Sequence, residues 1–229
     1  MLEIRTTQDG SRTIYNSELN TTYHSSWGAI QESRIVFIGN GLKAFDVYPE
    51  PLHILEIGFG TGLNAWLSWR ETKADSSLHI HYTGIEPFPL NRELWSELNY
   101  ADTDVMSEFK KLHELIPGQR NKLDERFSVC VRNEYFQEME FDEKYHLIYF
   151  DAFDPATQPE MWSDEVIRKC ASLLIPGGIW VSYCSKGDVR RSLQDAQLEV
   201  KRLKGPPGKR QILQARKPSL PHNHDKASL

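Results

Sequence analysis

Glycines at every second position follow a short apolar segment and lead directly into a second apolar stretch. Residues 53–62 read His-Ile-Leu-Glu-Ile-Gly-Phe-Gly-Thr-Gly, so that Gly58, Gly60 and Gly62 alternate. A strand that enters a helix through such a turn lets a ligand approach the backbone, because glycine has no side chain and a helix N-terminus presents free N–H groups. Glu86 ends the next apolar segment, where a carboxylate can accept hydrogen bonds from a ribose diol. We therefore expect a nucleoside cofactor at this turn.

The spacing and charge of the turn indicate which cofactor binds. Enzymes that use nicotinamide favour G-x-G-x-x-G, which holds a pyrophosphate. Here the pattern is G-x-G-x-G, and Glu56 precedes it. A carboxylate at that position would repel a pyrophosphate but would attract the ammonium group of S-adenosylmethionine. We expect this cofactor to bind through Glu56, Gly58, Phe59, Gly60, Gly62, Asn64, Glu86, Glu134 and Asp151. The alternative is a tight turn that binds nothing.

Composition limits the class of protein. A length of 229 residues suits one domain with additions, and the net charge is −5. No segment has the length of a membrane span, and no signal peptide opens the chain. Cys130, Cys170 and Cys184 are isolated in apolar surroundings, which is typical of reduced core residues in a cytoplasmic protein. We expect no metal site, because neither the cysteines nor the histidines have the spacing of metal ligands.

Apolar strands and helical stretches alternate after residue 50, which predicts an α/β fold with a parallel sheet covered on both faces. The expected strands are 53–57, 80–85, 127–131, 147–150 and 179–184, followed by the hairpin strands 199–203 and 211–215. The expected helices are 63–70, 92–98, 105–115, 164–174 and 189–196. This is the Rossmann-like, mainly parallel, seven-stranded sheet with a terminal antiparallel hairpin that is typical of class I methyltransferases.

Three parts of the chain are expected. Residues 1–50 form an N-terminal extension with a hairpin around Asp9-Gly10 and a short helix within 23–32. Residues 51–217 form the Rossmann-like domain, and residues 218–229 form a disordered tail. Ligands in such sheets bind beyond the carboxyl ends of the strands. Glu134 lies in one of these positions and could bond the adenine amino group, although a solvated loop carboxylate is the alternative.

A second motif follows the fourth strand and reads Asp-Ala-Phe-Asp-Pro at residues 151–155, with Pro-Glu-Met-Trp at residues 159–162. Asp154 precedes Pro155, which disfavours a helix there, and Ser163 can cap the helix that follows. The motif therefore forms a loop at the mouth of the cofactor cleft. Its carboxylates and flat aromatic rings suit a nucleobase that carries an amine. The alternative is a loop whose aromatic residues only cover the core.

These motifs resemble the methyltransferase domain of the MnmC-type enzymes that modify the wobble uridine of tRNA. The resemblance covers most of residues 56–210 and rests on Glu56 to Asn64, Glu86 to Leu90, Asp151 to Trp162, Pro176 to Gly178, Val189 to Arg191 and Gly208 to Arg210. It implies methylation of the aminomethyl group of 5-aminomethyl(-2-thio)uridine by S-adenosylmethionine. Bifunctional members also carry a flavin domain, and 229 residues are too few to hold it, so we expect no FAD. One departure is that Asn133-Glu134 stands where the family usually has Gly-Asp.

The resemblance also assigns roles to residues of the acceptor site. Asp151 is the expected catalytic residue, which orients the amine and accepts or relays its proton. The alternative is that Asp151 mainly orients the amine and water takes the proton. A lysine-like amine has a pKa of about 10.4, so a proton must leave before or during attack. The expected substrate-binding residues are Phe88, Phe153, Asp154, Pro155, Trp162, Arg190, Arg191, Lys209 and Arg210. The aromatic rings would stack on the base, and the basic residues would hold flanking phosphates.

Charge by itself leaves the basic segment open to two interpretations. Residues 186–217 contain ten lysines and arginines against Asp188, Asp195 and Glu199. Such a segment is either an electrostatic footprint for phosphates or an ordinary solvated face. The resemblance favours the first, and we expect the anticodon loop of a tRNA as partner, without DNA or a membrane.

Other functions remain open at this point. An aminopropyltransferase of the spermidine-synthase type shares the sheet and an Asp-rich fourth loop, but the basic segment disfavours it. A methyltransferase that acts on a small amine is another possibility, because a fold does not fix its substrate. A cofactor-binding RNA-interaction protein without turnover is the third, and the intact loop at Asp151 disfavours it.

Overall fold

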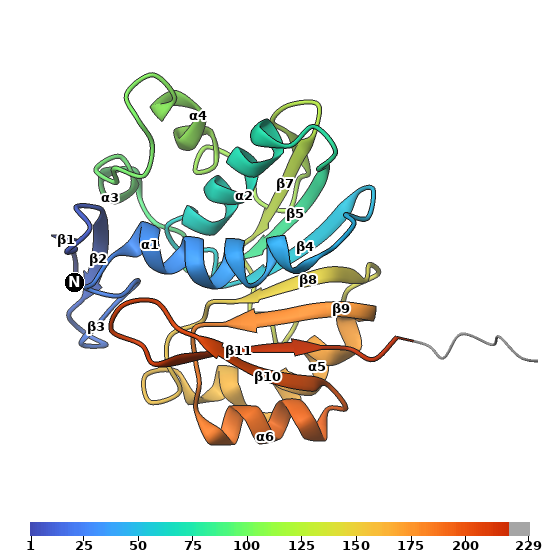
Figure 1. The fold of residues 1–229 in the computed structure, drawn as a ribbon. Helices are drawn as coiled ribbons and strands as arrows, with labels where there is room; N and C mark the ends of the chain where they lie inside the picture. The colour runs from blue at the N-terminus through green and yellow to red at the C-terminus, as the bar shows by residue number, and fades with distance from the viewer. Residues whose placement is uncertain (220–229) are drawn as a thin grey trace, which may run out of the picture.

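An eight-stranded sheet with helices on both faces forms the centre of the computed structural model, which describes residues 1–219 (Figure 1). The strands lie in the order β10-β11-β9-β8-β4-β5-β7-β6. Their bounds are β4 Leu52–Ile57, β5 Ile80–Ile85, β6 Asn121–Lys122, β7 Phe127–Arg132, β8 Tyr145–Phe150, β9 Leu174–Ser182, β10 Glu199–Lys204 and β11 Gln211–Arg216. The seven predicted strands are all present, and the prediction of a seven-stranded sheet missed β6. This edge strand has two polar residues and pairs antiparallel with β7, so it carries no apolar signal.

The strand order reverses next to β4, which is the first strand of the sheet along the chain. From β4 the chain adds β5 and β7 on one side, and then returns to place β8 and β9 on the other. These five strands are parallel, and β11 runs antiparallel to both β9 and β10, as the predicted hairpin requires. The carboxyl ends of β4, β5 and β8 therefore meet at the switch point, where ligands of such sheets bind.

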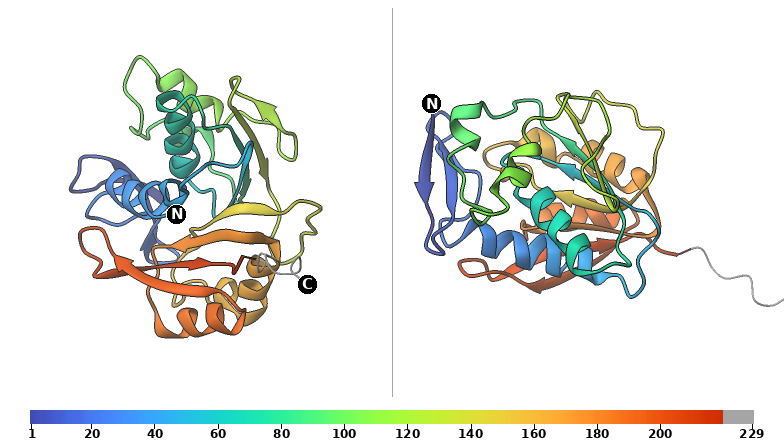
Figure 2. Two further views of the ribbon diagram at one scale, coloured as in Figure 1. Left: turned by 45° about the vertical axis from the view of Figure 1, so that its right-hand side comes forward. Right: turned by 90° about the horizontal axis from the view of Figure 1, so that it is seen from above.

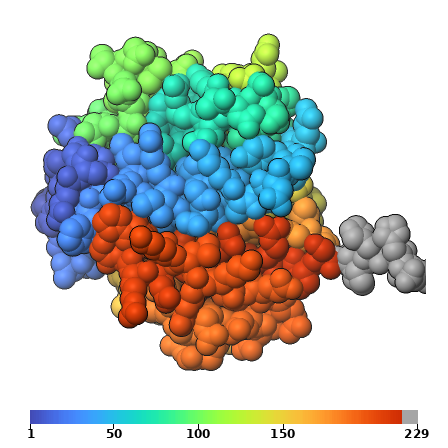
Figure 3. All heavy atoms as spheres, viewed as in Figure 1, coloured from blue at the N-terminus to red at the C-terminus, as the bar shows by residue number. Residues whose placement is uncertain are grey.

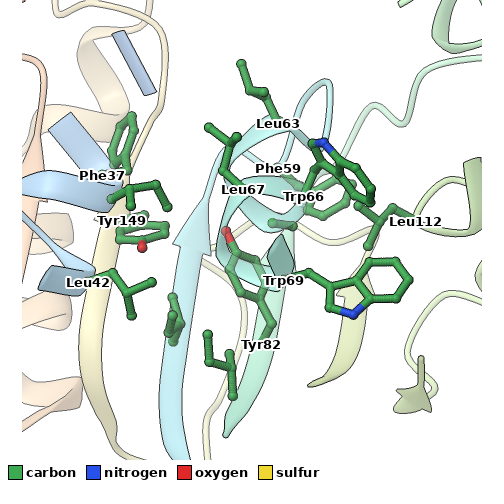
Figure 4. Packing of buried hydrophobic residues seen from close by; sticks show 14 of the residues in the cluster. Phe37, Leu42, Phe59, Leu63, Trp66, Leu67, Trp69, Tyr82, Leu112 and Tyr149 are labelled. Carbon is green, nitrogen blue, oxygen red and sulfur yellow. The ribbon is translucent and has the colours of Figure 1, made fainter. Parts of the chain in front are cut away.

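Apolar side chains alternate between two core clusters, one on each face of the sheet. Leu52 and Ile54 of β4 belong to one cluster, and Leu55 and Ile57 belong to the other. On the first face, α2 (Leu63–Ala74) places Trp66 and Trp69 near Tyr82 of β5 (Figure 4). On the second face lie α5 (Asp164–Leu173) and α6 (Gly187–Asp195), which pack against each other. Burial on both faces explains why the strands read as continuous apolar runs.

The N-terminal region contributes both a small sheet and part of the main core. Strands β1 (Leu2–Thr6), β2 (Arg12–Asn16) and β3 (Thr21–Thr22) form an antiparallel sheet that stands at one end of the molecule (Figure 2). The predicted hairpin is present, and Gly10 in its turn has a φ of 82°. The helix expected within 23–32 is α1 (Ala29–Ser33), which continues as a π-helix, Arg34–Gly39, and a 3-10 turn, Leu42–Ala44.

The segment that follows α1 packs against the main sheet. Val36, Phe37, Ile38 and Leu42 are buried in the same cluster as the first face of the sheet. Figure 4 shows Phe37 and Leu42 beside Tyr149 of β8. Residues on both sides of the boundary expected at residue 50 therefore pack in one hydrophobic cluster.

The remaining helices are shorter than predicted. These are α3 (Arg92–Trp95), which Asn91 caps through the Leu94 N–H, and α4 (Met106–Lys111). Cys130, Cys170 and Cys184 are buried, as predicted. Within residues 1–219, every helix is too short or too polar to cross a membrane. Of the tail predicted at 218–229, residues 220–229 lie outside the described part of the chain.

Candidate active site

A cavity of about 930 Å³ opens at the carboxyl ends of β4, β5 and β8. Residues from five parts of the chain line it, and among them are Tyr23, His24, Gly58, Phe59, Gly60, Asn64, Glu86, Phe88, Tyr135, Asp151 and Phe153. The structure therefore brings together most of the residues that the two sequence motifs supplied. It also adds residues of the N-terminal sheet, which the sequence analysis did not assign to the site.

The glycine turn has the backbone conformation that its composition predicts. Gly58, Gly60 and Gly62 have φ values of 91°, 50° and 71°, in the left-handed region that favours glycine. A Cβ on Gly58 would lie 2.5 Å from the carbonyl oxygen of Asp151. The turn that follows β4 and the loop that follows β8 are thus in backbone contact. Gly62 ends the turn as the N-cap of α2.

One amide holds two carboxylates below this turn. The Nδ2 of Asn64 donates to Glu56 Oε1 at 2.8 Å and to Asp151 Oδ2 at 2.9 Å. The hydroxyl of Tyr82 donates to the other oxygen of Glu56 at 2.8 Å. The Oδ1 of Asn64 is buried and has no hydrogen-bond partner among residues 1–219. The cluster therefore has an unsatisfied acceptor beside two carboxyl groups, which suits a ligand that donates a hydrogen bond or carries a positive charge.

Burial raises the pKa values of both carboxyls in this cluster. For Glu56, burial raises the pKa well above its usual range, and the nearby Asp151 adds to the effect. For Asp151, burial again raises the pKa well above the usual range, and the Glu32 carboxylate adds to it. The Asn64 amide and the Lys209 ammonium oppose the rise at Asp151. A carboxyl with a raised pKa is a stronger proton acceptor once it is ionised.

Glu86 lies at the end of β5, as predicted, and its carboxylate forms hydrogen bonds with the backbone of two neighbouring loops. Its oxygens accept hydrogen bonds from the N–H of Gly60 at 2.8 Å and of Phe88 at 3.0 Å. Burial raises its pKa, and these two backbone bonds oppose the rise. The side chain lines the cavity, so it can also meet a ribose there.

Two pairs of aromatic residues surround the cavity. Tyr23 meets Phe153 edge to face at 5.1 Å between ring centroids, and a Cβ on Gly60 would lie 3.2 Å from the Tyr23 ring. Burial and the Glu86 carboxylate raise the pKa of Tyr23 to about 12, so its hydroxyl stays protonated. At the mouth, Phe88 and Tyr135 form a second edge-to-face pair at 5.8 Å and are 64% and 48% exposed. Tyr23 and Tyr135 gave no signal in the sequence, because neither is part of a recognisable motif.

The rest of the loop after β8 supports the site from outside the cavity. Trp162 is buried against Phe150, and its Nε1 donates to the carbonyl of Phe153 at 2.7 Å. Asp154 accepts hydrogen bonds from Ala156 N and Thr157 Oγ1, both at 2.8 Å. Pro155 continues this turn. Stacking of Trp162 on a base is therefore incompatible with its position in the structure.

Glu134 lies outside the cavity. It is exposed and forms a salt bridge with Arg132, whose Nε lies 2.8 Å from its Oε1. The neighbouring residue Tyr135 lines the cavity instead. In this structure the backbone after β7 therefore presents an aromatic ring at the position where we expected a carboxylate.

The four basic residues assigned to phosphates have different surroundings. Arg190 donates to Gln194, and Arg191 contacts Asp188 on the same helix. Arg210 is exposed at the turn between β10 and β11. Lys209 is different, because its ammonium group pairs with the buried Glu32 and lies 3.7 Å from the ring centroid of Tyr183. That geometry directs Lys209 inward and away from a phosphate on the surface.

Comparisons with known proteins indicate the family to which the chain belongs. A family model described as S-adenosyl-L-methionine-dependent methyltransferase matches residues 96–218. The "tRNA 5-methylaminomethyl-2-thiouridine biosynthesis bifunctional protein MnmC" of Aromatoleum aromaticum is 30% identical over 92% of the chain. The chain spans about a third (34%) of that relative's length. The crystal structure of MnmC2 from Aquifex aeolicus matches with a TM-score of 0.80 and 27% identity, over 96% of this chain and 72% of that one.

Proposed function

Because the chain belongs to the family of S-adenosyl-L-methionine-dependent methyltransferases, we propose that it methylates the amine of 5-aminomethyl(-2-thio)uridine at the wobble position of tRNA. The name of the relative from Aromatoleum aromaticum and the similarity to MnmC2 support this acceptor. The reaction takes place in the cytoplasm, which agrees with three buried cysteines that form no disulfide with one another. The partner is the anticodon loop.

The residues of the site suit the donor. The unpartnered Oδ1 of Asn64 and the carboxylate of Asp151 offer acceptors to an ammonium group, whereas Glu56 is buried outside the cavity with both oxygens hydrogen-bonded. The positive φ values at Gly58 and Gly60 keep the turn free of side chains, so the ligand can contact the backbone. Glu86, which lines the cavity, would accept hydrogen bonds from the ribose. When bound, S-adenosylmethionine supplies an electrophilic methyl group on a sulfonium.

Asp151 is the residue that handles the proton. The acceptor amine must lose a proton as its nitrogen forms a bond to the methyl carbon, and an ionised carboxylate next to it can take that proton. The raised pKa of Asp151 brings its proton affinity closer to that of the amine. The same shift requires a higher pH before the carboxyl is ionised. We therefore expect the rate to rise with pH as Asp151 loses its proton.

The observation that carries the proposal is the contact between the two motifs. The glycine turn and the Asp151 loop meet backbone to backbone at Gly58, and Asn64, which lines the cavity, hydrogen-bonds one carboxylate from each motif. A donor bound at the turn would therefore lie next to the proton acceptor. The exposed pair Phe88 and Tyr135 at the mouth can stack on unpaired bases of the loop.

Mass spectrometry of nucleosides tests this function. Transfer RNA from cells that lack this protein is incubated with the purified protein and S-adenosylmethionine, and is then digested. The expected result is conversion of 5-aminomethyl(-2-thio)uridine into its N-methylated form. Unchanged nucleosides, or methylation of free amines but not of tRNA, would overturn the proposal.

A further inference from the structure

An ion pair joins two segments that are far apart in the sequence, and it lies next to Asp151. Glu32 of α1 pairs with Lys209 in the turn between β10 and β11. The side chain of Glu32 is 7% exposed and that of Lys209 is 29% exposed. Figure 3 shows the atoms of these two parts of the chain, blue and red, in contact on one face of the molecule. Burying such a pair costs free energy unless its geometry is good and further contacts satisfy the two charged groups.

Lys209 is linked to the Asp151 loop through Tyr183. The ammonium group lies 3.7 Å from the centroid of the Tyr183 ring, a cation–π contact. The hydroxyl of Tyr183 donates to the carbonyl oxygen of Ala152 at 2.9 Å. Ala152 is the residue after Asp151, so Lys209 packs on a ring that holds the backbone of the catalytic loop. A lysine that contacts phosphate on the surface would need none of these contacts.

The two members of the ion pair act on Asp151 in opposite directions. The negative charge of Glu32 favours a protonated Asp151, whereas the positive charge of Lys209 favours an ionised one. The titratable or charged groups near Asp151 are Glu32, Glu56, Tyr82, Tyr100, Tyr183 and Lys209. Lys209 is the cation in this set.

We propose that Lys209 is a positioning residue: its ammonium group offsets part of the negative charge around Asp151 and, through Tyr183, keeps the Asp151 loop in place. The inference rests on the proposed role of Asp151 in methyl transfer. It replaces the expectation that Lys209 binds a phosphate of the tRNA. The ammonium group of Lys209 then favours the ionised form of Asp151 in a site that is buried and crowded with negative charge.

A carboxyl titration tests the inference without any substrate. The protein is labelled with ¹³C at aspartate carboxyls, and the Asp151 resonance is assigned by its loss in Asp151→Asn. In Glu32→Gln the midpoint of Asp151 should fall by about 0.5 to 1 unit, because a negative charge is removed. In the double variant with Lys209→Met the midpoint should rise again by a similar amount. These two variants differ only at Lys209. Because position 32 carries glutamine in both, protonation of Glu32 cannot mask the effect of removing the lysine charge.

Equal midpoints in Glu32→Gln and in the double variant would overturn the inference, as would a midpoint in Glu32→Gln equal to that of the wild type. If the double variant does not fold, Lys209→Arg is the second test. This variant keeps the positive charge and should keep the wild-type midpoint of Asp151. A shift comparable to that in Glu32→Gln would also overturn the inference. Lys204→Met is the matched control, because Lys204 is exposed at the end of β10 and should leave the titration unchanged.

Methylation kinetics separate this role from phosphate binding. Lys209→Met should lower kcat and leave the KM for tRNA nearly unchanged, whereas loss of a phosphate contact raises KM. A rise in KM with unchanged kcat would overturn the inference. If the wild-type protein does not methylate tRNA, the proposed function fails, and the titration still reports whether Lys209 controls Asp151.

Discussion

At the scale of single residues, the site depends on the amide of Asn64. This side chain keeps Glu56 and Asp151 close together by donating one hydrogen to each of them. Its oxygen is left without a partner among residues 1–219. A buried acceptor in that state costs free energy unless a ligand satisfies it. We therefore regard Asn64 as the link between binding of the donor and positioning of Asp151.

The catalytic role of Asp151 is tested by its closest uncharged replacement. Asp151→Asn keeps the shape of the side chain but cannot accept a proton, so kcat should fall by about 10²-fold or more. Binding of S-adenosylmethionine, measured by calorimetry, should change by less than about tenfold, because the turn and Glu86 remain. A variant with near-normal kcat would show that Asp151 does not accept the proton.

At the scale of elements, the turn after β4 connects the two halves of the site. Two features require glycine at position 58. Its φ is 91°, and a Cβ would lie 2.5 Å from the carbonyl oxygen of Asp151. Gly10 in the N-terminal hairpin has a φ of 82° with nothing within 4 Å of a Cβ. A comparison of substitutions at the two glycines therefore distinguishes the effect of backbone strain from the effect of a close contact.

Alanine at each of these glycines measures the two effects. Gly10→Ala should lower the free energy of unfolding by about 1 to 2 kcal/mol through strain alone, and the protein should still bind S-adenosylmethionine. Gly58→Ala should lose clearly more stability in urea unfolding and should no longer bind the donor, because the loop at Asp151 must move. Equal losses in the two variants would mean that the contact with Asp151 is unimportant.

At the scale of the whole molecule, both ends of the chain converge on the site. The N-terminal segment supplies Tyr23 to the cavity wall and Glu32 to the ion pair. A Cβ on Gly208 would lie 2.2 Å from Trp27, so the hairpin of β10 and β11 is packed closely against the same segment. The exposed basic residues of this hairpin therefore lie beside the segment that lines the cavity.

Salt dependence tests whether this surface binds tRNA. Lys204 and Arg210 are both exposed at the hairpin. Their joint replacement by alanine should reduce the steepness of log K against log salt by about 1 to 2, because fewer counterions are released. Lys111→Ala with Lys122→Ala removes the same charge from exposed positions near α4 and β6, and should leave the slope unchanged. The same slope in both pairs of variants would show that the hairpin does not contact tRNA.

Much of the fold and part of the site could be predicted from local patterns. The alternation of apolar strands with helices predicted the sheet, and the two motifs predicted Gly58, Asn64, Glu86 and Asp151 at its carboxyl edge. The strand β6 was missed because pairing, not composition, makes it a strand. Trp162 and Lys209 have the residue types that stack on bases or bind phosphates, but their side chains pack inward.

The sequence by itself determined the parallel sheet and the glycine turn, because strand propensity and glycine's freedom at positive φ act within a few residues. It also determined that carboxylates follow the strands at the cleft. Only the tertiary structure decided which groups surround Asp151. Glu32 and Lys209 are 177 residues apart along the chain, and packing of the hairpin on the N-terminal segment brings them together. The pKa of a buried carboxyl depends on such neighbours, so no local pattern could have predicted it.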